Sequence, residues 1–336
     1  MTPTQMKAVV LTPHGQALQD VKTLAPEPDE VLIQVKAASL NRADLLSVKR
    51  GVDQHNAERL KSHPGMPSIL GNECAGIVAE VGAAVIAIKV GDRVMGTAFA
   101  SHAEYAIASP GNLHIIPEGM TYQDAACLPV ALVAMHDAIV TAGRLNAGDS
   151  VLIQGASSAV GLIGLQVARQ MGAGAVFGTS TTAEKRAQLG RYGADYAIDS
   201  SEPTWPEDVV AKTGGVGVNL IIDQIAGKTV LGSLHAAAQG ARFVNVGRLG
   251  GERGEFDFES HAFKRISYIG VTFRTRPADE AQAAIRRMWD DLAPAVADGN
   301  LTLPIDRAFS LNDADAAYRY MDSNHYFGKI VLTMGG

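Results

Sequence analysis

A glycine-containing turn between a strand-like and a helix-like segment is the strongest chemical pattern in this sequence. Ser150–Gly155 (SVLIQG) leads into small residues up to Gly161, where an apolar helical pattern continues. Small side chains let the backbone approach a bound phosphate, and a helix N-terminus offers it N–H donors and positive potential. The turn predicts a site for a dinucleotide pyrophosphate; alternatively, its glycines serve only close packing. The residues expected there are Gly155, Ser157, Ser158, Ala159, Val160 and Gly161.

The end of the next strand-like segment indicates which nucleotide this site would take. An acidic residue there would bind the ribose 2′-hydroxyl of NAD. This chain instead has hydroxyl side chains and, one turn further on, a lysine, which suit a 2′-phosphate through charge-assisted hydrogen bonds. We therefore expect NADPH as the cofactor, although Lys185 could instead be an ordinary solvated residue. The expected contacts are Thr179, Ser180, Thr181 and Lys185, with Asn245, Val246 and Gly247 at the end of a later strand.

Strand and helix patterns alternate from about residue 124 onward. This alternation is typical of a parallel sheet with helices on both faces. We predict an α/β fold with a doubly wound parallel Rossmann sheet over residues 125–272, entered by a helix at Asp124–Thr141. The predicted strands are Ser150–Gly155, Ala175–Ser180, Tyr196–Ile198, Val218–Asp223, Ala241–Gly247 and Ile266–Phe273. The predicted helices between them are Ala159–Met171, Ala183–Arg191, Pro206–Thr213 and Thr229–Ala238.

The first third of the chain is β-rich, with short β-branched runs between Gly, Pro and Asp. Residues 51–68 are polar and indicate a mobile loop of a length that is more often functional than idle. The last strand-like residues, GKIVLTM, lie far along the chain from the predicted sheet. We therefore expect the tail to return to the first domain, which would comprise residues 1–124 and 273–336. The runs predicted as strands are Lys7–Leu11, Glu30–Lys36, Gly76–Val81 and Asp92–Met95, and the tail adds helices at Ala278–Ala297 and Asp313–Met321.

Length and composition limit the class of protein. The 336 residues give room for two domains, and 47% hydrophobic with 19% charged residues is an ordinary globular balance. A formal net charge of −6 argues against nucleic acid as a partner. Two cysteines are too few for a disulfide scaffold or a four-thiolate zinc site, and Cys127 lies in an apolar stretch where a buried, inert thiol is expected. The sequence has neither a signal-peptide pattern nor a long apolar span, so we expect no membrane partner and a cytoplasmic location.

In chain order, these segments resemble the medium-chain dehydrogenase/reductases, and among them the zinc-independent quinone oxidoreductases of the zeta-crystallin type. The resemblance covers nearly the whole chain. It implies a β-rich, GroES-like catalytic domain beside the Rossmann domain, and hydride transfer from NADPH to a quinone or an activated enone without metal or flavin. The motifs that carry it are MKAVVLTPHG, EVLIQVKAASLNRADLL, ILGNECAGIVAEVG, VGDRVMG, HAEYAIAS, IIPEGMTYQDAACLPV, AGDSVLIQGASSAVG, GADYAID and FGKIVL.

The same resemblance argues against a metal. Zinc alcohol dehydrogenases of this family have Cys where this chain has Asn41, His where it has Asn72, and a second Cys near Val130. A catalytic zinc needs three protein ligands with N, O or S donors, and two amides and a valine do not supply them. Ala43 and Leu46 also lack the hydroxyl and imidazole of an alcohol proton relay.

The resemblance further implies residues around the nicotinamide and the substrate. Asn41 and Asp44, in the pattern N-x-x-D, match family positions beside the nicotinamide, and Asn41 can donate its amide N–H to an acceptor oxygen. Asn72 fills the vacated metal position and could point at the substrate. Alternatively, Asn41 is a loop cap and Asp44 only orients the loop. Further candidate cofactor contacts are Phe273 and Arg274, after the last sheet strand, and Lys329 in the closing GKIVL.

The sequence leaves two alternative functions open and also predicts an assembly state. An enoyl or alkenal double-bond reductase would use related chemistry, although no dense Lys/Arg cluster marks a groove for the phosphates of coenzyme A. A non-catalytic NADPH-binding protein is the alternative from another class, because tyrosines common in the family's quinone reductases are replaced, one by Leu46. The apolar strand Ile266–Phe273 is expected at a sheet edge, where pairing with its own copy would give a homodimer.

Overall fold

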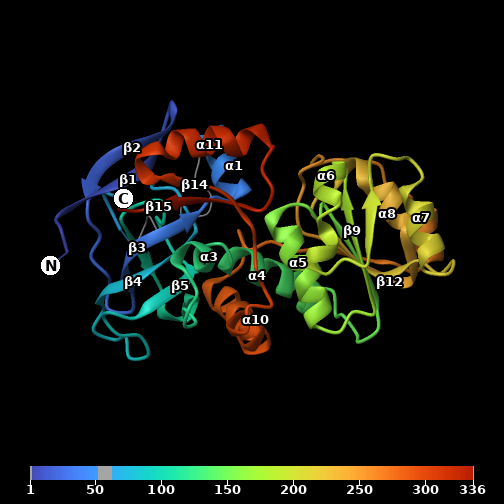
Figure 1. Cartoon of the computed structure of the whole chain (residues 1–336), viewed down its shortest axis with the longest axis horizontal. Coiled ribbons are helices and arrows are strands. Elements are labelled where there is room, and N and C mark those ends of the chain that lie inside the picture. The colour runs from blue at the N-terminus through green and yellow to red at the C-terminus, as the bar shows by residue number, and fades with distance from the viewer. Residues whose placement is uncertain (1, 52–62, 336) are drawn as a thin grey trace. The chain divides into compact units, whose positions relative to one another are not determined.

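The structure, a computed structural model, describes residues 2–51 and 63–335 (Figure 1). It forms two compact units: Met1–Val130 with Thr302–Gly336, and Ala131–Leu301. Residues 52–62, most of the loop predicted at 51–68, lie outside the described residues, so that loop stays a prediction. None of the described helices combines the length and the apolar character needed to cross a membrane.

The first unit is β-rich, as predicted. In the described part of the chain, its main sheet has seven strands in the order β14-β15-β3-β4-β5-β7, with β6 paired to β3, while β1 and β2 form a separate hairpin. The strands are β1 (Gln5–Thr12), β2 (Gly15–Lys22), β3 (Val31–Ser39), β4 (Glu73–Val81), β5 (Arg93–Thr97), β6 (Tyr105–Ala108), β7 (Leu113–Ile115), β14 (Ile305–Ser310) and β15 (Lys329–Thr333). The helices are α1 (Arg42–Arg50), α3 (Tyr122–Ala126) and α11 (Ala314–Ser323). No pattern in the sequence predicted β2, β6, β7, α1 or β14.

The C-terminal strand completes this sheet, so the tail does return to the first unit. β15 pairs antiparallel with β3, with Val331 opposite Ser39. Buried apolar side chains of β3 and β15, among them Val35 and Ile330, pack in one core cluster with Tyr318 of α11. Burial of this apolar surface is the main force that holds the tail in place. The pairing brings the start of β15 next to the end of β3.

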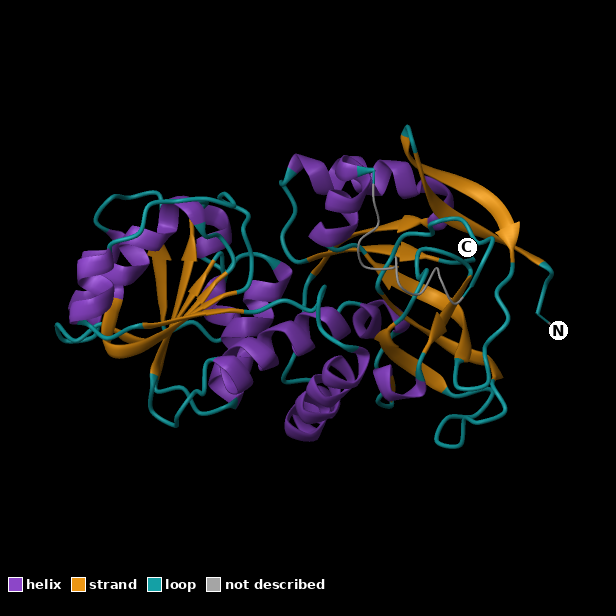
Figure 2. Cartoon of the chain, turned by 180° about the vertical axis from the view of Figure 1, so that it is seen from behind, coloured by secondary structure: helices purple, strands orange, loops and turns teal. Residues whose placement is uncertain are grey.

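The second unit confirms the predicted doubly wound α/β fold. Its six strands are all parallel and lie in the order β10-β9-β8-β11-β12-β13, flanked by helices (Figure 2). The order reverses between β8 and β11, and ligands of such sheets bind at this switch point, outside the carboxyl ends of the strands. The strands are β8 (Ser150–Gln154), β9 (Ala175–Ser180), β10 (Tyr196–Asp199), β11 (Val218–Asp223), β12 (Ala237–Asn245) and β13 (Ser267–Gly270).

The helices from residue 129 to residue 301 differ from the predictions at three places, and one of them is the helix at Phe258–Phe263, which was not predicted. The segment predicted as one helix at Asp124–Thr141 is divided, because Pro129 has no N–H to continue a helix and begins a new one instead. The helix predicted at Ala183–Arg191 ends at Arg186 and gives way to a 3₁₀ turn that closes at Gly193, where φ is +98°. The helices are α4 (Pro129–His136), a π-helical turn (Asp137–Ala142), α5 (Ala159–Gln170), α6 (Ala183–Arg186), α7 (Trp205–Lys212), α8 (Val230–Ala236), α9 (Phe258–Phe263) and α10 (Ala278–Ala297).

The unit boundaries lie at 130/131 and 301/302, whereas the expected domain boundaries were 124/125 and 272/273. The difference at the second boundary has a physical cause in α10 and the turn before it. His136 Nε2 lies 2.7 Å from a carboxylate oxygen of Asp291, and Arg276 donates to buried Asp137 at 2.8 Å. These contacts tie α10 and its leading turn to the helical segment that opens the second unit.

Candidate active site

The glycine turn has the geometry of a phosphate-binding loop. Gly155 follows β8 with φ of +71°, which favours glycine. Ser158 caps α5, and its Oγ accepts a hydrogen bond from the Gly161 N–H at 3.0 Å. A Cβ on Gly161 would lie 2.5 Å from the Gly155 carbonyl oxygen, so a side chain there would push the turn and the helix apart. The N–H groups of Ala159 and Val160, the first two residues of α5, have no acceptor within the helix and are available to an anion.

A buried polar network lies beneath this turn. The Thr179 hydroxyl accepts from the Gly155 N–H at 3.0 Å and donates to Gln154 Oε1 at 2.8 Å. The Gln224 side chain donates to the Gln154 carbonyl oxygen at 3.2 Å. Thr179, expected as a cofactor contact, therefore has its hydroxyl engaged in positioning the turn. The sequence analysis missed Gln154 and Gln224, although a glutamine at the end of a fully apolar strand is a usable signal, since buried amides need partners.

The carboxyl end of β9 brings the other predicted nucleotide contacts together. The Ser180 and Ser157 hydroxyl oxygens are 3.1 Å apart, so the two loops meet there. Thr181 is exposed and Lys185 is half-buried. The sequence analysis missed Arg186, which donates to the Ser180 carbonyl oxygen at 3.0 Å and forms a 2.6 Å ion pair with Asp199.

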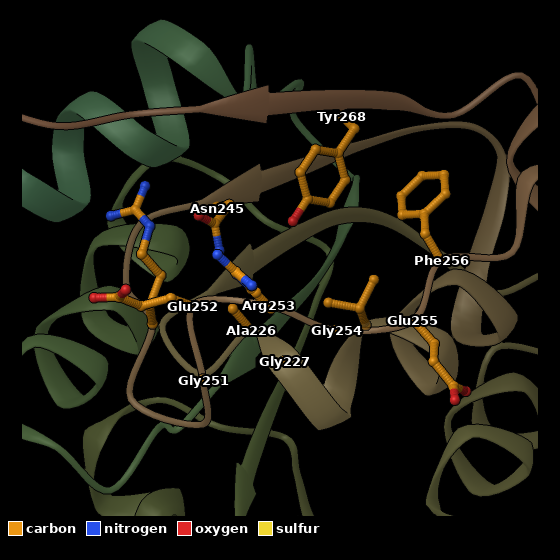
Figure 3. A pocket seen from close by; sticks show the side chains of 12 residues that line it. Ala226, Gly227, Asn245, Gly251, Glu252, Arg253, Gly254, Glu255, Phe256 and Tyr268 are labelled. Atoms are coloured by element: carbon orange, nitrogen blue, oxygen red, sulfur yellow. The ribbon is translucent and has the colours of Figure 1, made fainter.

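Asn245, Val246 and Gly247 continue from the end of β12 along the end of β11. The N–H groups of Val246 and Gly247 both donate to the Asp223 carbonyl oxygen, at 2.8 and 3.1 Å. Asn245 forms part of the wall of a cavity of about 170 Å³, which Arg248, Phe256 and Tyr268 also line (Figure 3). Burial raises the pKa of the Asp223 carboxyl group, whose Oδ1 accepts two backbone N–H groups of the turn leading to α8. The structure thus brings these predicted residues to the carboxyl edge of the sheet.

Phe273 and Arg274 lie in the turn that follows β13. The Arg276 guanidinium lies over the Phe273 ring, 4.3 Å from its centroid, and the same guanidinium donates to Asp137. The hydrogen bond to the Asp137 carboxylate raises the pKa of Arg276, which keeps the guanidinium charged. Arg276 therefore fixes the turn that carries the two predicted contacts.

In the first unit, Asp44 connects Asn41 and Asn72. One Asp44 carboxylate oxygen accepts from the Asn41 N–H, and the other accepts from the Asn72 side chain, both at 2.7 Å. Asn41 is the N-cap of α1, and Asp44 is buried in its first turn, where a carboxylate is favoured by the helix dipole. The three residues predicted to be catalytic are thus brought into one cluster.

Lys329 and Glu73 form a fully buried ion pair behind this cluster. The Lys329 ammonium donates to Glu73 Oε1 at 2.6 Å, and to Asn41 Oδ1 and Ser39 Oγ at 2.9 Å each. Glu73 also accepts from the Asn41 side-chain N–H at 2.7 Å and from the Val130 N–H at 2.8 Å. All three ammonium hydrogens are used by protein oxygens. Lys329 was predicted as a cofactor contact. In the structure it fixes the orientation of the Asn41 amide, with Oδ1 accepting from Lys329 and Nδ2 donating to Glu73.

A buried histidine, His102, contacts both Tyr318 and the backbone of Ser39, the residue that hydrogen-bonds to this ion pair. His102 Nε2 lies 3.2 Å from the Ser39 carbonyl oxygen, which only accepts, so this nitrogen carries the proton. His102 Nδ1 then accepts from the Tyr318 hydroxyl at 2.8 Å. Sequence reasoning missed both residues, because neither belongs to a local motif and they lie 216 residues apart.

The two cysteine thiols of the chain are buried and are not candidate catalytic groups. Both Cys74 and Cys127 are buried, and burial raises the pKa of each to about 12. The thiolate is the reactive form of cysteine, so both side chains are inert at neutral pH. This agrees with the inert thiol expected at Cys127.

The donor set at the family's zinc position does not suit a metal. Asn41 and Asn72 present amides that are committed to Glu73, Lys329 and Asp44, and Val130 contributes only its backbone N–H. Of the two carboxylates that contact these amides, Glu73 is paired with Lys329, and Asp44 accepts hydrogen bonds from Asn41 and Asn72. Among residues 2–51 and 63–335, no group of three or more His, Cys, Asp or Glu side chains is arranged to hold a metal ion.

The first prediction therefore concerns metal. Asn41, Asn72 and Val130 replace the zinc ligands of the family's zinc enzymes. Extensive dialysis against a chelator should therefore leave the turnover rate within about twofold of the untreated protein, and the protein should bind less than one zinc per chain. Turnover would be measured before and after dialysis, and zinc by atomic emission. Loss of turnover on chelation that added zinc restores would contradict this prediction.

The glycine turn at a switch point and a separate unit with a buried polar cluster together define a two-domain, nicotinamide-dependent oxidoreductase. Residues 27–138 match the alcohol dehydrogenase GroES-like domain family, and residues 159–290 match the zinc-binding dehydrogenase family. The chain belongs to the medium-chain dehydrogenase/reductases. Members of this family bind a nicotinamide nucleotide, and the cradle at Gly155–Gly161 fits its pyrophosphate.

Individual relatives include reductases and larger synthases. The highly reducing polyketide synthase cm3B of Cordyceps militaris is 30% identical over 93% of this chain, which spans 12% of that protein's length. Among solved structures, the CurK enoyl reductase is 25% identical with a TM-score of 0.82, over 98% of this chain and 100% of that one. A mycobacterial quinone oxidoreductase is also 25% identical, with a TM-score of 0.81, over 98% and 99%. The chain spans only 12–15% of the length of the first curated relatives. The activity of each of those whole proteins is therefore not assigned to this chain.

Proposed function

We propose that this chain transfers hydride from NADPH to a quinone or an activated enone without a metal or a flavin. The observation that carries the proposal is the buried cluster of Asn41, Glu73 and Lys329, in which Asn41 matches by sequence the position of a zinc-binding cysteine in the family's zinc enzymes. Bound NADPH would supply the hydride. The protein's own tasks are then to hold the nucleotide, exclude water and stabilise negative charge on the acceptor oxygen.

The proposed role of Asn41 follows from its hydrogen bonds. Its Oδ1 accepts from Lys329 and one Nδ2 hydrogen goes to Glu73, so the second Nδ2 hydrogen is the one that could donate to an acceptor oxygen. Asp44 and Asn72 are proposed to orient the same loop toward the substrate. Gly155 to Gly161, Ser180, Thr181, Lys185 and the Asn245–Gly247 segment are proposed to hold NADPH, with Phe273 and Arg274 as further contacts.

The second candidate is reduction of an enoyl or alkenal double bond, which the likeness to the CurK enoyl reductase favours. The experiment that separates the candidates is product analysis of NADPH consumption with 1,4-benzoquinone, 9,10-phenanthrenequinone and an α,β-unsaturated ketone. Turnover of quinones supports the first candidate, and saturation of the C=C bond alone supports the second. Tight NADPH binding with no turnover on any acceptor would overturn both in favour of a non-catalytic nucleotide-binding protein.

The second prediction concerns the nucleotide. If Lys185 binds the 2′-phosphate, Lys185→Ala should weaken NADPH binding by roughly 10- to 100-fold and hardly change NADH binding. The dissociation constants would be measured by calorimetry. Lys212→Ala removes an exposed lysine at the end of α7, whose ammonium lies over the Tyr196 ring at the start of β10 and so away from the carboxyl ends of the strands, and is the matched control. An equal loss for both nucleotides would show that Lys185 acts through structure.

The third prediction is that the chain forms a homodimer. β13 is the last strand of the sheet, pairs with β12 and leaves its other edge unpaired in the described chain. Tyr268 on this strand and Phe258 nearby are large apolar side chains that remain exposed. Light scattering at micromolar concentration should give twice the 35.3 kDa chain mass, and Tyr268→Lys should lower it. A wild-type protein with the monomer mass would refute this prediction.

A further inference from the structure

Asp199 stands at a position that matters for nucleotide choice. It ends β10 and lies in register with Ser180, the last residue of β9. In doubly wound sheets the adenosine ribose lies near the end of the second strand, where an acidic side chain accepts from the 2′-hydroxyl of NAD and repels a 2′-phosphate. An unpaired Asp199 would therefore favour NADH, against the preference expected from Lys185.

The contacts of Asp199 occupy both of its carboxylate oxygens. Oδ1 accepts from the Ser201 N–H at 3.0 Å and from its hydroxyl at 2.5 Å. Oδ2 forms the 2.6 Å ion pair with Arg186. The Ser201 hydrogen bonds lower the pKa of Asp199, so the group is charged at neutral pH, and Arg186 is the cation that pairs with it.

Arg186 is held in the position that this pairing needs. Its other terminal nitrogen donates to the Ser180 carbonyl oxygen at 3.0 Å, so one guanidinium bridges the ends of β9 and β10. Only 20% of the Arg186 side chain and 29% of the Asp199 side chain are exposed, so solvent screens the pair incompletely.

We propose that the Arg186–Asp199 ion pair sets the preference for NADPH: Arg186 engages the carboxylate that ends β10, and this edge can then accept a 2′-phosphate. The inference rests on the proposed function, which gives this edge a nucleotide. It adds a specificity-determining residue beside Lys185. Arg186 acts through Asp199: the guanidinium balances the negative charge of the Asp199 carboxylate.

The test is calorimetric binding of NADPH and NADH to the full-length protein and its variants. Arg186→Gln should weaken NADPH binding by about tenfold or more and leave NADH binding unchanged or tighter. Adding Asp199→Asn to Arg186→Gln should restore NADPH binding to within about threefold of the wild type. Arg186→Lys keeps a cation next to Asp199 and should retain most of the preference.

Controls separate this inference from folding and from the proposed function. Arg191→Gln removes an exposed arginine one turn beyond α6 and should change neither dissociation constant. Thermal unfolding identifies any variant that does not fold, and Asp199→Asn alone, which should keep NADPH binding within about threefold, then still tests the pair. Equal losses for both nucleotides in Arg186→Gln, or a double variant as weak as the single one, would overturn the inference. A wild-type protein that binds neither nucleotide would instead remove the proposed function.

Discussion

Lys329→Met should lower the free energy of unfolding by about 3–5 kcal/mol, the largest stability effect we expect from one substitution. The ion pair with Glu73 is buried on both sides, with 2% and 0% of the two side chains exposed. Methionine has a similar length but no charge, so the Glu73 carboxylate would stay buried without its cation. Ser39 and Asn41 would each lose a partner as well. Urea unfolding followed by circular dichroism measures the change.

An exposed ion pair in the same unit provides the matched control. Lys49 and Asp322 are 2.5 Å apart, with about half of each side chain exposed, and Lys49→Met should cost less than about 1 kcal/mol. Adding Glu73→Gln to Lys329→Met should recover part of the loss, because the remaining amide carries no charge. A cost for Lys329→Met as small as that for Lys49→Met would show that the buried pair does not hold the cluster.

Asn41→Ala should lower the rate constant of hydride transfer by about 10²-fold, the largest kinetic effect we expect. The physical reason is the loss of an amide donor that acts on the acceptor oxygen as charge develops there. The alanine variant also loses the hydrogen bonds of Asn41 to Glu73 and Lys329. The measurement is therefore single-turnover kinetics at saturating NADPH on the folded fraction of the protein.

Ser39→Ala separates the two consequences of that substitution. Ser39 hydrogen-bonds to the same ion pair, at 2.5 Å to Glu73 and 2.9 Å from Lys329, but it is not a proposed donor to the substrate. Its loss should destabilise the fold by about 1 kcal/mol while the hydride-transfer rate stays within a few-fold. Equal slowing in the Ser39 and Asn41 variants, or an unchanged rate in Asn41→Ala, would remove Asn41 from the catalytic residues. Weaker NADPH binding with an intact rate at saturation would make it a cofactor-positioning residue instead.

The sequence predicted the second unit well because its signals are local. Apolar runs such as Val218–Asp223 are strands at the predicted bounds, and the glycine turn lies between a strand and α5 as predicted. The helix at Ala278–Ala297 also has its predicted bounds, because its apolar face repeats over many turns. Segments without a long periodic pattern, such as β14 and α1, were missed.

The side-chain partners at the site could not be predicted, because they depend on contacts between distant parts of the chain. Glu73 and Lys329 are 256 residues apart, and only the pairing of β15 with β3 brings them together. A match to a family pattern suggested Asn41, Asp44 and Asn72 as site residues. The hydrogen bonds that Asn41 and Asn72 both donate to Asp44 depend on how the loops fold, and the sequence did not predict them. Arg186 follows Lys185 directly, and nothing local distinguishes which of the two cations reaches Asp199.

Metal-free hydride transfer from NADPH is tested by single-turnover oxidation of NADPH deuterated at nicotinamide C4. The protein, freed of metal by a chelator, would be mixed with this NADPH and an excess of quinone or enone. We expect NADPH to be oxidised with the chelator present, and deuterium to slow the step by about two- to threefold, since the C–H bond breaks in the step observed. Oxidation that appears only after zinc is added, or a rate of the chemical step that deuterium does not change, would show that the protein does not transfer hydride in this way.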